Sequence, residues 1–338
     1  MDGMSGLTSS LLRLAAKGVD LAGLSAPISV ALGYARPTAA FPILSFHRVN
    51  RDNDPFFPAL PTDVFERQMA FIARAYVVLP VEDLVARMRR GALPRNALAI
   101  TFDDGYRDNL THAAPILARH GLPATVFVVT GAIDTGEALW FDRLALAFKQ
   151  ARATGWTAPW GEALPLESVG ERLAALGKTL TRFKAMTNRE RRGQVEEVLA
   201  SLGVGDERPL KNVMLSWDDV HALMGLGVTI GAHTVSHPIL AQLSAEEARA
   251  EVEGSRAAIR KNGGRAPQAF AYPNGRTADY TQGVVSLVRD AGFTCAVTTQ
   301  FGVNTAATPP YELRRGGPWE HHLPTFALKL AGYRLTEV

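Results

Sequence analysis

The hydrophobic positions fall into short apolar runs that alternate with longer segments of helical periodicity. The apolar runs cover residues 41–46, 97–102, 124–129, 228–230, 269–272 and 295–298. Helical spacing of apolar residues covers 62–75, 81–90, 107–120, 242–262 and 281–291. Gly121, Gly264 and Gly292 follow three of these segments, as glycine often does where a helix ends. The alternation predicts β/α units arranged around a parallel sheet or barrel.

Two parts of the chain depart from this rhythm. Residues 137–213 are too long for a single crossover, and they carry two helical stripes, at 173–183 and 195–202, with a candidate cap at Thr187. We therefore predict a mostly helical insertion at 137–213 within a barrel domain that spans 39–338. Residues 1–38 form a separate segment, in which 6–34 have amphipathic helical spacing.

The N-terminal segment does not look like a membrane span or a secretory signal. Its apolar stretch is interrupted by Lys17, Asp20 and Pro27, and it is shorter than the roughly 18–20 residues that a span needs. We expect it to pack on the domain or to make a peripheral membrane contact through 6–34. The expected location is the cytoplasm or the inner membrane surface.

Five apolar stretches end in polar clusters. The residues at these ends are His47, Asp103-Asp104, His233, Pro273-Asn274-Gly275 and Arg314-Arg315. In a parallel β/α barrel the carboxyl ends of all strands lie on one face, where active sites form. Segments far apart in the sequence are therefore expected to converge on a single site.

Two of these clusters together indicate a catalytic metal site. Asp103 and Asp104 are adjacent at a strand end, so their side chains point in different directions and can serve different purposes. His233 and His237 are four residues apart and can face one ion. Two imidazoles and one carboxylate leave coordination positions open for water or substrate, which is typical of a catalytic metal.

These motifs resemble those of the polysaccharide deacetylase family, also called the NodB-homology domain or carbohydrate esterase family 4. The resemblance covers roughly 40–317 and rests on Thr-Phe-Asp-Asp-Gly at 101–105 and on His-Thr-x-x-His at 233–237. It implies a distorted parallel (β/α) barrel of about seven strands and one bound divalent ion. It also implies Asp103 as catalytic base and Asp104, His233 and His237 as metal ligands.

A third stretch resembles the family motif that lines the substrate groove. In Phe-Ala-Tyr-Pro-Asn-Gly at 270–275, we expect Tyr272, Pro273, Asn274 and Gly275 to line the groove, with the backbone N–H of Tyr272 or a neighbour stabilising the oxyanion. The family's arginine that braces the base is absent here, because Ala271 stands near its place. Arg314, Arg315 or Arg276 are the candidates to replace it.

The general acid is also not where most family members have it. Phe46-His47-Arg48-Val49 looks like the version of the family, found in biofilm-glycan deacetylases, in which an early strand ends in histidine. We therefore expect His47 to be the acid. His321 and His322 are alternatives, and a further one is that His47 is merely a buried, hydrogen-bonded histidine.

The resemblance leads to a function, with rivals. The expected activity is metal-dependent hydrolytic deacetylation of a carbohydrate, by default an N-acetylhexosamine in a glycan or glycan precursor. Alternatives are an O-acetyl esterase, a ureide hydrolase of the same fold, or a carbohydrate-binding module without catalysis. Zinc suits the ligand set, although nickel, cobalt, manganese or iron also bind such sites. Iron oxygenases share the ligand types but carry His-x-Asp on an all-β fold.

Composition adds little beyond two exclusions. The formal net charge is only +3, without a concentrated basic stripe, so nucleic acid is not an expected partner. The single cysteine, Cys295, excludes an intrachain disulfide and stands in an apolar run, where it is expected to be buried.

Overall fold

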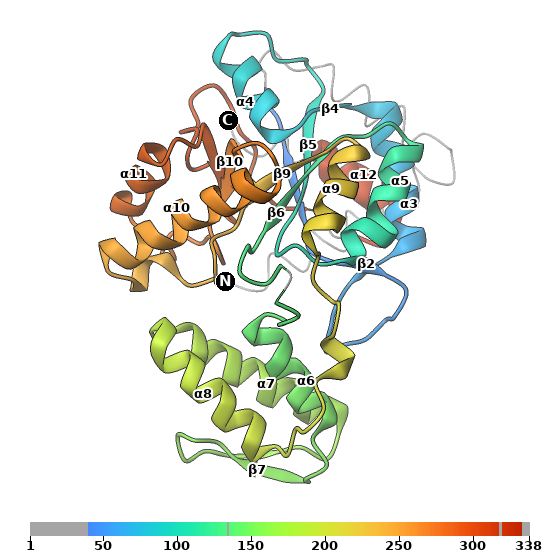
Figure 1. Ribbon diagram of the computed structural model, residues 1–338. Helices are drawn as coiled ribbons and strands as arrows, with labels where there is room; N and C mark the ends of the chain where they lie inside the picture. Colours follow the sequence, from blue (N-terminus) through green and yellow to red (C-terminus); the bar gives the residue numbers. More distant parts are fainter. Residues whose placement is uncertain (1–39, 134, 318–319, 333–338) are drawn as a thin grey trace.

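The computed structural model describes residues 40–133, 135–317 and 320–332 (Figure 1). The predicted amphipathic segment at 6–34 lies outside these residues. Among the helices that are described, none combines the length and the apolar character needed to cross a bilayer.

A curled parallel sheet forms the centre of the molecule. Its strands follow the order β1 (Ile43–Phe46), β5 (Ala97–Phe102), β6 (Ala124–Val128), β9 (Val228–Ala232), β10 (Ala269–Ala271) and β11 (Cys295–Val297). A seventh strand, β4 (Val77–Val78), also pairs with β5, and every pairing in this sheet is parallel. The sheet curls into a half-barrel flanked by helices, which confirms the predicted distorted (β/α) barrel of about seven strands.

Helices cover the outside of the half-barrel (Figure 1). They are α3 (Thr62–Ala75), α5 (Ala114–Arg119), α9 (Trp217–Gly225), α10 (Ala245–Asn262), α11 (Gln282–Asp290) and α12 (Leu323–Gly332). A further helix, α4 (Val81–Arg89), instead packs its buried residues against the inward-facing side chains of the strands. The helix predicted at 107–120 is replaced in its first half by a π-helical turn, η1 (Asn109–Ala113). Asn109 in this turn donates a hydrogen bond to the His47 carbonyl at 2.8 Å, which ties the turn to the end of β1.

Side chains alternate between the inside of the barrel and the outer helical layer. Along β5, Ala97 and Ala99 belong to the inner core, whereas Leu98, Ile100 and Phe102 belong to the outer one. The same alternation continues past the strand end, so the inward direction falls on odd-numbered positions. Cys295 is fully buried in the inner core, as expected, and burial raises the pKa of its thiol to about 12.

The segment between β6 and α9 forms a lobe of its own beside the strand ends (Figure 1). It contains α6 (Trp140–Gln150), the hairpin β7 (Gly155–Thr157) and β8 (Ala163–Pro165), α7 (Val169–Lys184), α8 (Asn188–Ser201) and the short η2 (Arg208–Leu210). Thr187 caps α8 as the sequence predicts, in a reciprocal box with Glu190. The lobe has a separate hydrophobic core, which includes Phe148, Phe183 and also Phe56. The division of the chain into an N-terminal segment at 1–38 and a barrel domain at 39–338 stays a prediction.

Phe56 comes from outside the lobe. It stands in the connection between two further short strands, β2 (Val49–Asn50) and β3 (Leu60–Pro61), which pair with each other just after β1. Phe56 packs into the core of the lobe, so this connection joins the lobe to the barrel, and Phe56 borders the same cavity as His47.

Candidate active site

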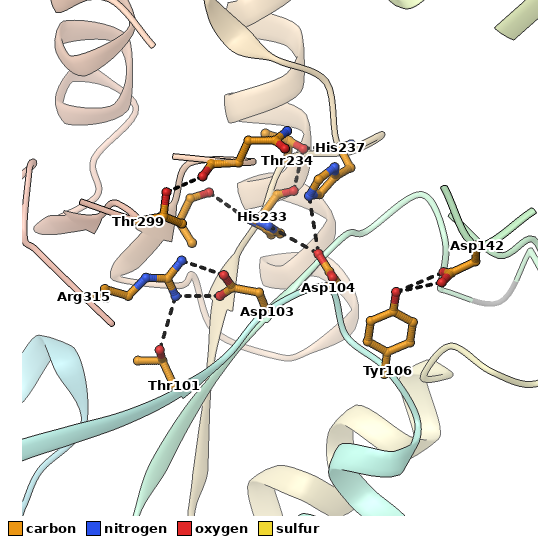
Figure 2. Close-up of polar contacts among 12 residues, drawn as sticks. Thr101, Asp103, Asp104, Tyr106, Asp142, His233, Thr234, His237, Thr299 and Arg315 are labelled. Atoms are coloured by element: carbon orange, nitrogen blue, oxygen red, sulfur yellow. Dashed lines mark hydrogen bonds and ion pairs between the residues drawn. The ribbon is translucent and has the colours of Figure 1, made fainter. Parts of the chain in front are cut away.

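Asp103 and Arg315 form a buried ion pair at the mouth of the half-barrel. The guanidinium of Arg315 donates to both carboxylate oxygens of Asp103, at 2.7 and 2.6 Å. The same side chain donates to the Thr101 hydroxyl at 3.2 Å and to the Thr298 carbonyl at 2.8 Å, and it is fully buried. Asp103 continues the inward-facing positions of β5, and its carboxylate faces the Arg315 guanidinium (Figure 2).

The ion pair keeps Asp103 ionised. Burial by itself would raise the pKa of this carboxyl, but the charge of Arg315, the charge of His233 and the hydrogen bonds from Arg315 outweigh it and hold the pKa below its ordinary value. A carboxylate in this state can accept a proton at neutral pH, which is what a general base requires.

Asp104 faces the two histidines on its other side (Figure 2). Its Oδ1 lies 3.5 Å from His233 Nε2 and 3.4 Å from His237 Nε2, and one ligand atom of each residue lies within 4.8 Å of the others. Two ligand atoms bound about 2.0–2.2 Å from one tetrahedral zinc ion lie roughly 3.3–3.6 Å apart, and the two separations from Asp104 fall in this range. The three side chains are buried.

The surroundings of the two imidazoles suit metal ligation. His233 Nδ1 lies 2.7 Å from the Ala271 carbonyl, and because a carbonyl can only accept, Nδ1 carries a proton and Nε2 is the ring nitrogen that a metal ion could bind. Burial lowers the pKa of His237, which favours a neutral imidazole there. His237 Nδ1 is buried, and no partner for it is found in the described part of the chain.

The loop that carries the histidines is held by Glu251 of α10. The Glu251 carboxylate accepts hydrogen bonds from the N–H groups of Val235 and Ser236, at 2.8 and 2.9 Å, and from the Ser236 hydroxyl at 2.5 Å. At the start of the same loop, the Thr234 hydroxyl accepts the His237 N–H at 3.0 Å. These contacts fix the distance between the two imidazoles, and nothing in the local sequence around Glu251 marks it for this role.

Backbone conformations of high energy gather at this site. Four of the six non-glycine residues with positive φ in the described chain are Asp104, Thr234, His237 and Asn274. For a threonine or a histidine this conformation costs on the order of 1–3 kcal/mol, and such residues cluster at functional sites. The surrounding hydrogen bonds hold the loops in these strained shapes.

In the third motif, at 270–275, the side chain of Tyr272 does not point where the sequence predicted. Tyr272 faces the outer layer, where its ring stacks on Tyr280 and its hydroxyl donates to the Tyr311 carbonyl at 3.0 Å. Its N–H donates to the Val297 carbonyl at 3.2 Å, in the sheet. The expectation that Tyr272 faces the groove or supplies the oxyanion N–H is therefore corrected, because strand alternation points it away from the site.

The turn that follows Tyr272 is tightly built. Pro273 has no N–H, and the Gly275 N–H donates to the Pro273 carbonyl at 2.7 Å. Gly275 has a φ of 66°, and a Cβ there would lie 2.8 Å from the Thr299 nitrogen, so only glycine fits. Asn274 is half-buried, and its carbonyl accepts from the Thr299 hydroxyl at 2.5 Å.

Comparison with known proteins agrees with this geometry. The family described as Polysaccharide deacetylase matches residues 90–296, which include both motifs and all three predicted ligands. The chain belongs to the polysaccharide deacetylase family. Over 93 residues it is 31% identical to YxkH of Bacillus subtilis (strain 168), which is named among the polysaccharide deacetylases. The match spans 27% of this chain and about a third of YxkH.

Solved structures of deacetylases share the fold. The deacetylase PplD of Streptococcus pyogenes aligns with a TM-score of 0.57 at 20% identity, over 82% of this chain and 92% of its own. IcaB from Ammonifex degensii aligns with a TM-score of 0.52 at 19% identity, over 87% and 97%. A de-N-acetylase from Aggregatibacter actinomycetemcomitans aligns with a TM-score of 0.53 at 16% identity, over 82% and 94%.

In this member of the polysaccharide deacetylase family, a cavity of about 490 Å³ opens beside Asp104. His47 borders this cavity and is exposed, so it is not a buried structural histidine. The charge of His47 contributes to lowering the pKa of both Asp103 and Asp104, after larger contributions from burial and from nearer partners. His321 borders the same cavity, whereas His322 binds the Thr325 hydroxyl at 2.9 Å.

Of the three arginines considered as the brace for the base, the structure brings only Arg315 to Asp103. The backbone groups of Arg314 bind the Asn304 side chain, and its side chain borders a separate cavity with Gln300. Arg276 is exposed, and its N–H donates to Asp279.

One buried carboxylate in the cavity has no counterpart in the sequence prediction. Asp142, in the first turn of α6, accepts hydrogen bonds from the Tyr106 hydroxyl, which lies 3.0 Å from each of its oxygens (Figure 2). Tyr106 directly follows the first motif, and Asp142 follows two aromatic residues at a helix start. That local pattern is the only signal in the sequence that points to Asp142.

Proposed function

We propose that this chain hydrolyses acetyl groups from carbohydrate with the help of one divalent metal ion. The observation that carries the proposal is the convergence of Asp104, His233 and His237 beside Asp103, which Arg315 holds. Base and ligand set are adjacent, and a cavity large enough for a sugar opens next to them.

The three ligands would hold the metal and leave part of its coordination open. When bound, a divalent ion lowers the pKa of a coordinated water and polarises an acetyl carbonyl. Zinc matches the mixed nitrogen and oxygen donors, and nickel, cobalt, manganese and iron also suit them.

The residues of the chain supply proton transfer and orientation. Asp103, kept ionised by Arg315, takes the proton of the attacking water, and the arginine fixes the direction in which the carboxylate accepts it. For the oxyanion we propose the Asn274 N–H, because the Tyr272 and Gly275 N–H groups are already bonded and Pro273 has none.

His47 is the proposed general acid. It borders the cavity next to Asp104, and the hydrogen bond from Asn109 to its carbonyl fixes its position at the end of β1. Histidine is the side chain that most often transfers protons in catalysis, so His47 can protonate a departing amine. His321, on the same cavity, is the alternative.

For the substrate we propose an N-acetylhexosamine within a glycan or a glycan precursor. Family membership supports an acetylated carbohydrate, and the similarity to a de-N-acetylase of known structure supports an N-acetyl group. The early histidine supports the same choice, because an amine leaves poorly unless it is protonated.

Acetate release tests this proposal. The purified protein would be incubated with N-acetylated and O-acetylated glycans, after treatment with chelator and again after zinc, cobalt or nickel is added back. We expect release from N-acetylhexosamine glycans that chelator abolishes and metal restores. Release that is indifferent to chelator would refute the metal, and no release from any glycan with any metal would refute the activity.

A further inference from the structure

The cavity beside Asp104 is walled by two parts of the chain that are not barrel strands. Phe56 and Phe57 come from the connection between β2 and β3, and Phe141 and Leu180 come from the helical lobe. Small-molecule sites are commonly apolar pockets in which a few placed polar groups give orientation. Asp142 is a polar residue in this largely apolar pocket, and it belongs to helix α6 of the lobe rather than to the barrel.

The Asp142 carboxylate is only partly satisfied by the protein. It is 5% exposed, the Tyr106 hydroxyl donates to it, and no lysine or arginine within the described residues forms an ion pair with it. Arg48, the nearby cation, is paired with Asp108 at 2.8 Å. A carboxylate has about four lone-pair positions, so acceptor capacity remains on the cavity side.

A purely structural role would not need the negative charge. Asp142 occupies the third position of α6, where an asparagine could also accept from Tyr106 without the cost of burying a charge. Burial, with the charge of Asp104 next, raises the pKa of Asp142 to about 7, which measures how unfavourable this environment is for the anion. Ionisable side chains with strongly shifted pKa values in a cleft are candidates for a functional role.

We propose that Asp142, held by Tyr106, is a substrate-positioning residue that accepts hydrogen bonds from the hydroxyl groups of an uncharged sugar bound against Phe57 and Phe141. The same carboxylate, next to Asp104, disfavours a sugar that carries a carboxylate at this position. The inference rests on the proposed deacetylase function and extends it to the substrate that the site prefers.

The test compares Asp142→Asn with wild-type protein on two substrates, in the metal-loaded protein. One is a chitooligosaccharide, which has sugar hydroxyls and N-acetyl groups, and the other is an aryl acetate, which has no sugar. Asparagine keeps one acceptor oxygen, which Tyr106 occupies, and it turns an NH2 group towards the sugar. Loss of the charged acceptor should reduce kcat/KM on the oligosaccharide by about 10- to 100-fold, mainly through KM. The rate on the aryl acetate should stay within about twofold.

A second arm addresses selectivity. For wild-type protein, kcat/KM should be higher for a neutral N-acetylhexosamine oligomer than for one that carries carboxylate groups. The ratio of these two kcat/KM values, neutral over carboxylated, should fall towards one in Asp142→Asn. Equal losses of Asp142→Asn on the oligosaccharide and the aryl acetate, or an unchanged ratio, would overturn the proposal.

Asp219→Asn is the matched control, because Asp219 is also the third residue of a helix, α9, and stands in a capping box with Ser216. It removes a carboxylate from the same helix position away from the cavity, so its effect should not depend on the substrate.

A direct measurement of sugar binding distinguishes failure of this proposal from failure of the proposed deacetylase function. If wild-type protein binds the chitooligosaccharide by calorimetry but releases no acetate, the deacetylase activity fails while the binding role of Asp142 can still be measured. In that case Asp142→Asn should weaken the dissociation constant by the same 10- to 100-fold. Absence of oligosaccharide binding by wild-type protein, or equal affinity in the variant, would overturn the role of Asp142.

Discussion

Arg315 and Asp103 stand 212 residues apart in the chain and form a fully buried, two-pronged ion pair beside the candidate metal ligands. The arginine also bonds Thr101 on β5 and the carbonyl of Thr298 just past β11. It therefore links β5 to the end of β11, the last strand of the sheet order, across the mouth of the half-barrel. Through this contact, the orientation of the proposed base depends on closure of the barrel.

Replacing Arg315 by lysine should reduce activity by about 10- to 100-fold, because a catalytic group that is displaced by about 1 Å loses roughly this much. Lysine keeps the charge but lacks the planar fork that holds both carboxylate oxygens. Turnover and the melting temperature would be measured together. Arg314→Lys, the same substitution one residue earlier, is the control, and equal losses in both variants would argue against a specific role for Arg315.

Asp103→Asn should retain the metal but lose about 10²- to 10⁴-fold in turnover, the usual contribution of a general base. Its carboxylate is bound by Arg315 rather than by the histidines, which is why metal content should not change. Metal analysis and kinetics on the same preparation check this. A variant that loses its metal would show that Asp103 and Asp104 have exchanged roles.

His237→Ala should lower the metal content well below one ion per chain, because two ligands hold an ion far less well than three. Elemental analysis after dialysis measures it. His221→Ala, on the exposed side of α9, is the control and should keep the wild-type content. Equal metal in the two variants would refute the ligand assignment.

His47→Ala should severely reduce N-deacetylation and spare hydrolysis of an activated aryl acetate. The amine leaving group needs a proton, whereas a phenolate departs without one. His321→Ala is the informative comparison, since His321 borders the same cavity. If His321→Ala shows this selective loss and His47→Ala does not, the acid is His321.

Asp142→Asn should stabilise the metal-free protein at pH 8 more than at pH 4. The pKa of Asp142 is raised from 3.8 to about 7 in the folded protein, so ionisation favours unfolding, and folding stability is lost as pH rises from about 4 to about 7. Above pH 7 the loss is on the order of 4 kcal/mol, and asparagine removes it. Urea unfolding of chelated protein at both pH values measures the difference, and a variant that is less stable at pH 8 would contradict it.

The sequence by itself determined the features that depend on neighbouring residues. The periodicity of apolar positions predicted the β/α order, because a strand repeats every two residues and a helix every 3.6. Asp103 and Asp104 are adjacent, and His233 and His237 share one short loop. Within each motif, the side chains are therefore close together whatever the rest of the fold is. Barrel topology then needed only to bring two strand ends together, and parallel strands do so on one face.

Only the tertiary structure decided what depends on distant segments and on strand direction. Three arginines were equal candidates in the sequence, and Arg315 meets Asp103 because its position faces inward beside β11. Tyr272 was expected at the groove, but it occupies an outward position of its strand. Asp142 faces the cavity because the helical lobe packs against the strand ends. Local patterns encode periodicity, whereas these contacts depend on how separate elements dock, which no short stretch of sequence specifies.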